Sequence, residues 1–135
     1  MEPAECAILS GAGWGHHRIE GIGDGFVPEI LDLDLLDGVI QVTSQESIDM
    51  ARRLAQEEGI FCGISSGCNV AAALKLAAED PKYRRVATVI NDNGLRYLST
   101  ELCGGPAKVD SPDRHHPVDP ELGRRLKHLK LHIIS

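Results

Sequence analysis

A strand, a capping box and a helix follow one another in Gly38-Val39-Ile40-Gln41-Val42-Thr43-Ser44-Gln45-Glu46, residues 38–46. The apolar run 38–42 predicts a short buried strand. Thr43 and Glu46 are three residues apart and are the residue types of a capping box, so a helix is expected to begin directly after the strand. Apolar side chains then recur every three or four residues up to Ala55, and Gly59 is expected to end this helix.

The same alternation continues along the chain. Residues 60–64 predict a second apolar strand, and the small-residue stretch 69–78 predicts a helix. A third strand is expected over 85–90, then a turn over 91–94 and a short helix over 95–102. Strands that alternate with helices through short connections are typical of an α/β fold, so we expect a partial parallel sheet with flanking helices.

Composition excludes several classes of function. The chain has 135 residues, 42% of them apolar, and a formal net charge of -6. This charge argues against a nucleic-acid partner and against an anionic membrane surface. No signal peptide or membrane-spanning run is apparent, and the four cysteines form no Cys-x-x-Cys pair and no zinc spacing with histidine. We therefore expect reduced cysteines, no metal site and a cytoplasmic location.

The chain changes character after Cys103. Residues 1–103 are expected to form the α/β body, and residues 104–120, rich in Pro and Gly, a linker. Residues 121–135 predict a terminal helix or tail, with a helix opening at Pro120. This helix could cap the body, fray or bind a partner, and the pattern leaves these open.

The segment Gly63-Ile64-Ser65-Ser66-Gly67 is the sharpest chemical feature. A buried strand followed at once by Ser65 and a helix places hydroxyl and amide groups at the carboxyl edge of a parallel sheet, where ligands bind in open α/β folds. The alternative is that Ser65 or Ser66 only caps the helix. A nucleophilic serine is not expected, because no histidine or acid is placed to complete a triad.

Glycines are concentrated in a second segment, Gly21-Ile22-Gly23-Asp24-Gly25. It is similar to a dinucleotide-binding fingerprint, but no strand precedes it and the spacing is wrong. So many glycines indicate positive backbone φ angles or close approach of the backbone to another group.

Six segments carry a resemblance to a known family: Glu2-Pro3-Ala4-Glu5, Leu9-Ser10-Gly11, residues 17–28, residues 51–59, Gly63-Ile64-Ser65-Ser66-Gly67 and Arg96-Tyr97-Leu98-Ser99-Thr100. In this order and spacing they resemble the cysteine synthase (O-acetylserine sulfhydrylase) family, over residues 2–103. The resemblance implies the C-terminal part of a pyridoxal-phosphate enzyme of the tryptophan-synthase-β type. The implied reaction replaces acetate in O-acetyl-L-serine by sulfide to give L-cysteine. Cystathionine β-synthase is the alternative within the family.

The resemblance also implies roles for individual residues. Ser65 matches the hydroxyl that meets the pyridine nitrogen of pyridoxal phosphate, and a neutral hydroxyl suits β-elimination better than transamination. Gly21 and Gly23 match the loop that approaches the cofactor, with Ile22 and Gly25 in the part that closes over substrate. His17 and Arg18 match the basic pair beside the groove that receives the C-terminus of serine acetyltransferase, with Arg18 where Lys is usual.

The family's Schiff-base lysine and phosphate-binding loop match no segment of this sequence, so no catalytic residue is assigned. We therefore expect a truncated or split gene product that is inactive alone and does not retain pyridoxal phosphate. Its partners would be further copies of itself or a separately encoded N-terminal half. A non-catalytic remnant, or a module that docks serine acetyltransferase, are the alternatives.

Overall fold

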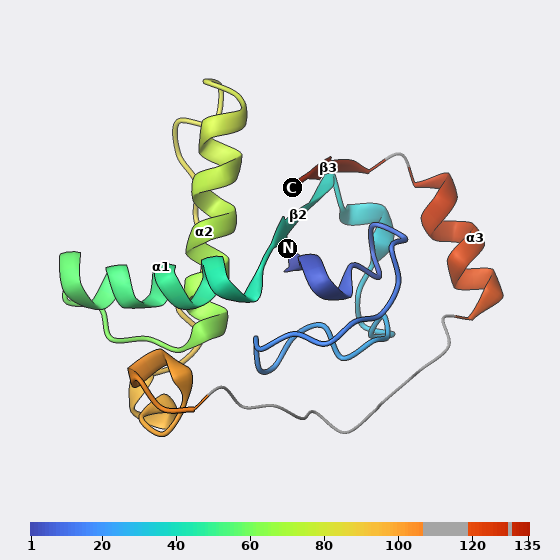
Figure 1. Ribbon diagram of the computed structural model, residues 1–135. Coiled ribbons are helices and arrows are strands. Elements are labelled where there is room, and N and C mark those ends of the chain that lie inside the picture. The colour runs from blue at the N-terminus through green and yellow to red at the C-terminus, as the bar shows by residue number, and fades with distance from the viewer. Residues whose placement is uncertain (107–118, 130) are drawn as a thin grey trace.

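The computed structural model describes residues 1–106, 119–129 and 131–135 (Figure 1). Its regular elements are β1 (Glu2–Pro3), β2 (Gly38–Val42), α1 (Ser44–Glu57), α2 (Ile64–Glu79), α3 (Pro120–His128) and β3 (His132–Ile134). Short 3₁₀ turns lie at Ala4–Cys6, Leu33–Leu35, Gly94–Tyr97 and Glu101–Cys103. The fold is α/β, as the alternating pattern predicted.

The described strands form a parallel sheet in the order β1-β2-β3. Glu2 pairs with Gln41 on one side of β2, and Val39 pairs with Ile133 on the other. The predicted strand 38–42 is thus confirmed as the central strand. β3 was not predicted, because it comes from a segment interpreted as a helix or tail.

The capping box at the start of α1 is confirmed. The Thr43 Oγ1 accepts a hydrogen bond from the backbone N–H of Glu46 at 3.1 Å, and the Glu46 carboxylate accepts from the backbone N–H of Thr43 at 2.7 Å. The helix ends at Glu57, and Gly59 follows with a φ of 69°. A positive φ costs a glycine little, so Gly59 ends α1 where the sequence predicted.

The core lies where α1 crosses α2 (Figure 1). A Cβ atom on Gly67 would overlap the backbone oxygen of Ser47 and would lie 2.8 Å from the backbone nitrogen of Ala51. The two helix backbones therefore approach so closely that only glycine fits. Buried side chains from both helices, from β2 and from two loops close this core, among them Ile19, Val42, Ile48, Ala51, Leu54, Cys62, Cys68, Ala71, Ala72 and Tyr97.

Three sequence predictions need correction. Residues 60–64 form no strand and make one antiparallel bridge, between Cys62 and Asn93. Residues 85–90 form no strand either, and the segment 95–102 forms two 3₁₀ turns in place of one helix. A strand needs a neighbour for its backbone hydrogen bonds, and both edges of β2 are already occupied by β1 and β3.

α2 begins at Ile64, five residues before the predicted start at 69, so both serines of the motif lie inside the helix. At the carboxyl end of the chain, the helix expected from Pro120 is α3, which ends at His128. Of the predicted linker 104–120, residues 107–118 lie outside the described residues.

Candidate functional site

The N-terminus of α2 has no side-chain cap. Gly63 is its N-cap residue and offers no side-chain cap, which rules out the interpretation of Ser65 or Ser66 as the capping residue. The first helical hydrogen bond runs from the backbone N–H of Gly67 to the carbonyl of Gly63. Within the described chain the N–H groups of residues 64–66 have no hydrogen-bond acceptor. They lie at the positive end of the helix dipole and can stabilise an electron-rich group.

Ser65 projects from this first turn and is 6% exposed. Its Oγ accepts a hydrogen bond from the Asn91 side-chain amide at 3.3 Å. No described group accepts the Ser65 hydroxyl proton, so the hydroxyl is held in place by Asn91 and can still donate. That is the arrangement an unprotonated ring nitrogen requires of its partner.

A second layer of polar contacts fixes this turn. The Ser66 Oγ accepts from the backbone N–H of Asn91 at 2.9 Å, and Tyr97 donates its hydroxyl to Asp92 at 2.6 Å. Burial, together with the Asp92 carboxylate, raises the pKa of Tyr97 to about 12. Gly63 fits only as glycine here, because a Cβ would collide with Asp92 and with the Tyr97 ring.

Sequence reasoning missed Asn91, Asp92 and Tyr97 as site residues. It treated Asn91 and Asp92 as turn residues, and Tyr97 only as part of the segment 96–100 that resembles the family. The available signal was the position of Asn91 and Asp92 directly after the apolar run 85–90, because polar residues at the end of such a run often face a ligand edge.

The glycine loop has the backbone that its sequence predicted. Gly21, Gly23 and Gly25 have φ angles of 88°, 69° and 84°. The loop folds against its own N-terminal segment, since the Gly23 carbonyl lies 3.1 Å from the Cys6 thiol and 2.9 Å from His17 Nε2. Close backbone approach is therefore present, and the group approached is the chain itself.

Gly21, Ile22 and Gly23 line a cavity of about 250 Å³ together with residues of β1. Neither Gly25 nor Ser65 lines it. His17 thus contacts the loop at Gly23, and Ser65 lies outside the cavity that Gly21, Ile22 and Gly23 line.

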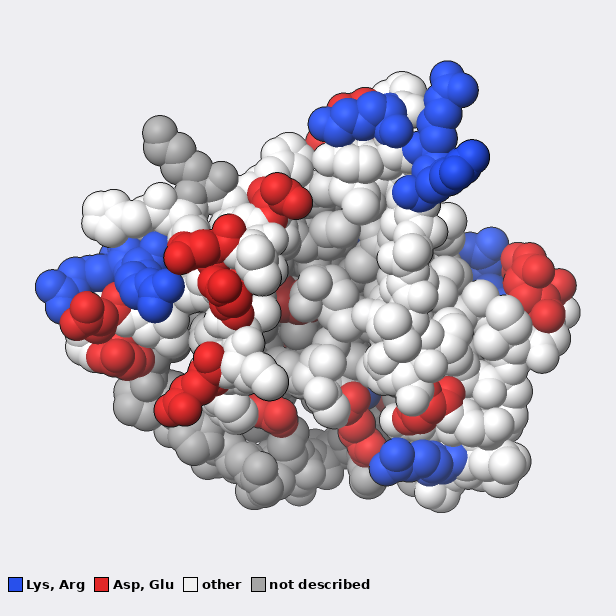
Figure 2. Space-filling view, turned by 180° about the vertical axis from the view of Figure 1, so that it is seen from behind, with Lys and Arg blue, Asp and Glu red and all other residues white. Residues whose placement is uncertain are grey.

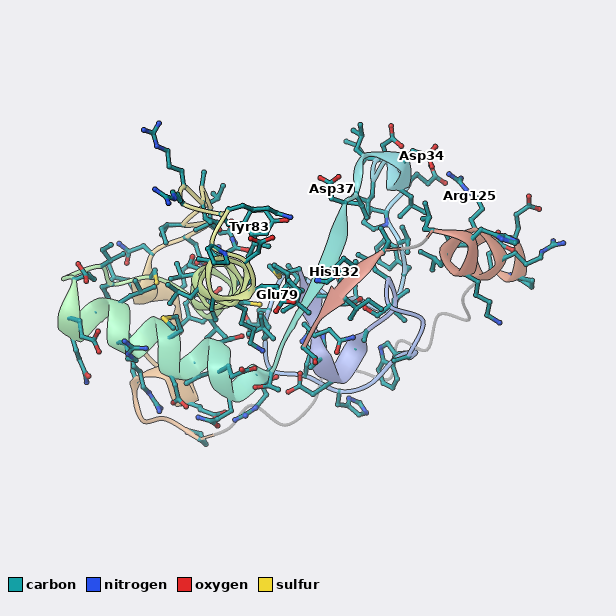
Figure 3. All side chains as sticks on the ribbon, turned by 90° about the horizontal axis from the view of Figure 1, so that it is seen from above. Asp34, Asp37, Glu79, Tyr83, Arg125 and His132 are labelled. Atoms are coloured by element: carbon teal, nitrogen blue, oxygen red, sulfur yellow. The ribbon has the colours of Figure 1, made fainter. Side chains whose placement is uncertain are left out.

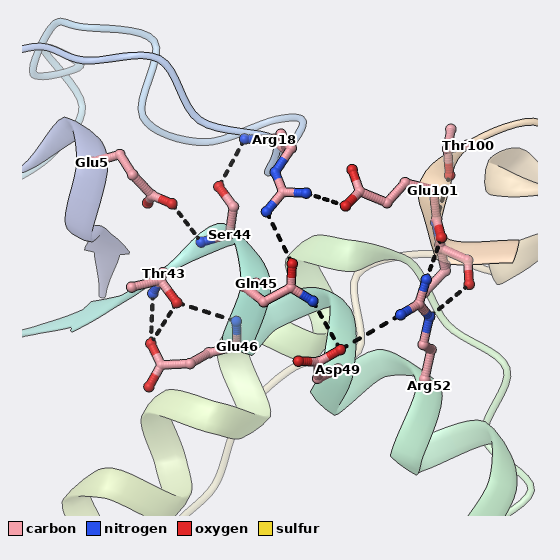
Figure 4. Close-up of polar contacts among 11 residues, drawn as sticks. Glu5, Arg18, Thr43, Ser44, Gln45, Glu46, Asp49, Arg52, Thr100 and Glu101 are labelled. Atoms are coloured by element: carbon pink, nitrogen blue, oxygen red, sulfur yellow. Dashed lines mark hydrogen bonds and ion pairs between the residues drawn. The ribbon is translucent and has the colours of Figure 1, made fainter. Parts of the chain in front are cut away.

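Arg18 is held by three contacts (Figure 4). Its guanidinium forms an ion pair with Glu101 and donates to the Gln45 side chain at 3.2 Å. Its backbone N–H donates to the Ser44 hydroxyl at 2.8 Å. Arg18 therefore ties the glycine-rich segment to the start of α1 and to the turn at Glu101–Cys103. An added carboxylate would have to displace Glu101 from the guanidinium.

A larger cavity of about 600 Å³ lies at the other end of α2, near the amino ends of β2 and β3 (Figure 3). It is lined by the polar residues Asp37, Glu79, Tyr83 and His132 and by apolar residues of β2. Glu79 lies 3.6 Å from His132, close enough for an ion pair when the imidazole is protonated. Ser65 does not line this cavity, and no sequence prediction pointed to it.

The described lysines do not fit a Schiff-base role next to Ser65. Lys75 bonds the Glu46 carboxylate and the Gln41 carbonyl, both at 2.9 Å, and lies ten residues along α2 from Ser65, about 15 Å at 1.5 Å per residue. Lys82 pairs with Asp80, and Lys127 lies on α3. The described residues thus place no lysine beside Ser65.

None of the helices in the described part of the chain has the length and hydrophobicity of a membrane span. Residues 1–106, 119–129 and 131–135 also contain no group of three or more His, Cys, Asp or Glu side chains that could hold a metal ion.

The resemblance to known proteins defines the class of this chain. Residues 1–92 match the family model of the pyridoxal-phosphate dependent enzymes, and the chain belongs to that family. Among its relatives, the cysteine synthase of Staphylococcus aureus is 44% identical over 102 residues, which are 76% of this chain and 33% of the relative. The chain thus spans about a third of the length of the curated relatives it matches.

Solved structures agree with this assignment. A cysteine synthase from Entamoeba histolytica superposes with a TM-score of 0.72 at 34% identity and covers 94% of this chain, which in turn covers 36% of that enzyme. An O-acetylserine dependent cystathionine β-synthase from Helicobacter pylori gives a TM-score of 0.64 at 41% identity, over 73% of this chain and 32% of its own. The fold is that of cysteine synthases, and both enzymes of the sequence-based alternatives are among the similar structures.

Proposed function

We propose that this chain provides the Ser65 side of a pyridoxal-phosphate site in an enzyme of the cysteine synthase type. A second polypeptide that carries the Schiff-base lysine would provide the other side. The observation that supports this proposal is the buried Ser65 hydroxyl, oriented by Asn91 at the uncapped N-terminus of α2 and still able to donate its proton. When bound, the cofactor supplies the electron sink for loss of acetate and addition of sulfide.

The chain's own residues would bind and orient in this site. Ser65 donates to the ring nitrogen, and Asn91 fixes the rotamer of Ser65. The free N–H groups of residues 64–66 place positive potential beside that bond. Because a hydroxyl donor leaves the nitrogen uncharged, the site favours elimination and replacement over transamination. We expect the chain alone to make no cysteine.

The test is reconstitution with the amino-terminal two thirds of the Staphylococcus aureus cysteine synthase. We expect the mixture to retain pyridoxal phosphate through dialysis, measured by its visible absorbance, and to form L-cysteine from O-acetylserine and sulfide. Ser65→Ala should weaken cofactor retention about tenfold, the loss of roughly one hydrogen bond, and Ser65→Thr should restore it. Unchanged retention in Ser65→Ala would overturn the role of Ser65.

The chain alone provides the matching control. After incubation with pyridoxal phosphate and dialysis, reduction with borohydride followed by mass spectrometry should find no lysine of the chain labelled in stoichiometric amount. Stoichiometric labelling of Lys75 would overturn the requirement for a second polypeptide.

Docking of a serine acetyltransferase C-terminus at His17 and Arg18 stays a prediction. The ion pair between Arg18 and Glu101 gives it less support than the Ser65 proposal, because a peptide carboxylate competes with Glu101. We expect calorimetry with a decapeptide ending in Ile to show micromolar affinity or weaker, reduced by Arg18→Ala. Affinity that Arg18→Ala leaves unchanged would end this alternative.

A further inference from the structure

Asn91 bonds both serines of the segment Gly63–Gly67. Its side-chain amide donates to the Ser65 Oγ at 3.3 Å, and its backbone N–H donates to the Ser66 Oγ at 2.9 Å. Each hydroxyl therefore accepts a bond from Asn91 and keeps its own proton to donate. The Ser66 proton has an acceptor in Asp92, whose Oδ1 lies 3.5 Å from the Ser66 Oγ. Among the described residues the Ser65 proton has none.

The direction of the bond between Asn91 and Ser65 decides what Ser65 can do. Because the Asn91 amide donates, the Ser65 Oγ is the acceptor and its proton is directed toward another group. A carboxylate at position 91 has no N–H and can only accept, so it would take the Ser65 proton for itself. The chemical identity of residue 91 therefore sets whether Ser65 can donate to a ligand.

Asp92, the residue after Asn91, is held by Tyr97. The Tyr97 hydroxyl donates to the Asp92 Oδ2 at 2.6 Å, a short bond of the kind that an ionised acceptor forms. No described Lys, Arg or His forms an ion pair with Asp92. Figure 2 views the molecule from behind, where the segment after α2 lies, and shows a largely uncharged strip with basic side chains at its upper end. Tyr97 thus holds the Asp92 carboxylate where a cation could otherwise do so.

We propose that Tyr97 is a positioning residue of the pyridoxal-phosphate site, a role that rests on the proposed function. Tyr97 holds Asp92, and this fixes the backbone of the neighbouring Asn91 against Ser66. The Asn91 amide is then held against Ser65, and the Ser65 proton is directed to the ring nitrogen. Tyr97 itself touches no part of the cofactor.

The test compares pyridoxal phosphate with its deaza analogue, in which a C–H group replaces the ring nitrogen. Equilibrium dialysis measures the affinity of the reconstituted mixture for each ligand. We expect the parent to bind pyridoxal phosphate about tenfold more tightly than the analogue, since the analogue lacks one hydrogen-bond acceptor. Ser65→Ala should bind both ligands equally. The ratio of the two affinities isolates the bond to the ring nitrogen, because a general loss of structure weakens both ligands alike.

Asn91→Asp should abolish the preference for pyridoxal phosphate, because the new carboxylate accepts the Ser65 proton. Asn93→Asp is the charge-matched control. The Asn93 Oδ1 accepts from the Leu95 N–H at 2.9 Å, and an aspartate keeps that bond, so this variant should retain the full preference.

Tyr97→Phe should lower the preference from about tenfold to about threefold or less, as expected when roughly half of one hydrogen bond is lost. Tyr83→Phe, at an exposed ring, is the control and should leave it unchanged. In the Asn91→Asp background, Tyr97→Phe should change the ratio no further, because Tyr97 acts through Asn91.

The outcomes separate this inference from the proposed function. A parent mixture that binds both ligands equally, or binds neither, overturns both. A preference that Ser65→Ala abolishes and Tyr97→Phe leaves intact overturns the role of Tyr97 alone. A preference that survives Asn91→Asp also overturns it, because the direction of the bond at Ser65 would then not depend on residue 91.

Discussion

The α1–α2 pair and the segment that follows it, residues 80–98, differ in where their apolar side chains lie. In the pair, Ile48, Ala51 and Cys68 are at most 1% exposed. In the later segment, Val89, Leu95 and Leu98 are 62%, 64% and 57% exposed. The helices pack on each other, whereas the later segment has a covered edge on α2 and an uncovered one. Amphipathic character alone does not place a segment in a core, because a neighbour must also be present.

Gly67→Leu should have the largest effect on the difference between the two regions, because it disrupts the packing of α1 against α2. The backbone of α1 leaves no room for a side chain at Gly67. We expect the free energy of unfolding to fall by roughly 3 kcal/mol or more, enough to abolish cooperative unfolding in urea. The control is Gly123→Ala on α3, where a Cβ meets nothing within 4 Å, and it should leave stability unchanged or slightly raised. A Gly67→Leu variant that unfolds like the parent would refute the close helix crossing.

Tyr97→Phe should have the next largest effect, because it removes the hydrogen bond that holds the later segment to α2 through Asp92. A bond to a charged acceptor contributes about 1.5–3 kcal/mol. Tyr83→Phe, at a more exposed ring, should have no comparable effect on the urea midpoint.

The raised pKa of Tyr97 adds a pH test. The folded state keeps its proton up to about pH 12, and the unfolded chain loses it near pH 10. The stability from this group is therefore complete below pH 10 and lost as the pH rises from about 10 to 12. Tyr97→Phe should flatten that decline, and an unchanged slope would contradict the assignment.

Thr43→Ala should lower the free energy of unfolding by about 1 kcal/mol, because it removes the N-cap of α1. Ser99→Ala, at an exposed serine, is the control.

Burial opposes ionisation of Glu46, but the hydrogen bonds from Thr43 and Lys75 outweigh it, so the pKa of Glu46 lies below its usual 4.5. This contribution is complete above pH 4.5 and is lost as the pH falls through the lower, folded pKa. Thermal unfolding as a function of pH measures it, and the acid decline should be shallower in Glu46→Gln.

Arg18→Ala should have the smallest effect on stability and lower the free energy of unfolding by less than about 1 kcal/mol. The reason is that the ion pair of Arg18 with Glu101 is partly exposed to solvent. Its consequence should be local, with faster proteolysis of the glycine-rich segment. Arg53→Ala, which breaks a fully exposed pair with Glu57, is the control and should change neither quantity. Equal behaviour of the two variants would show that Arg18 does not hold the loop.

Sequence reasoning succeeded where the information is local. The strand 38–42, the capping box and the end of α1 at Gly59 each depend on residues that lie next to one another in the sequence. β3 was missed because its three residues become a strand only by pairing with β2, which lies about ninety residues earlier. The strands predicted over 60–64 and 85–90 failed for the converse reason, since residues 60–64 meet only a single bridge, between Cys62 and Asn93, and no described strand lies beside residues 85–90.

The candidate site divides in the same way. The motif around Ser65 marks a helix N-terminus and a hydroxyl, both of which the sequence displays. The hydrogen bond from Asn91 reaches Ser65, 26 residues earlier on α2, and the contact of Asp92 with Tyr97 joins residues on either side of a turn. Their partners depend on the path of that turn, which propensities do not specify.

Hydrogen exchange of individual amides in dilute solution distinguishes the two regions. We expect slow exchange in α1 and α2, whose amides are bonded within packed helices. We expect fast exchange at Val86, Thr88 and Ile90, whose amides have no hydrogen-bond partner within the described chain. Fast exchange throughout α1 and α2, or protection at residues 86, 88 and 90 equal to that of the two helices, would contradict the difference between the two regions.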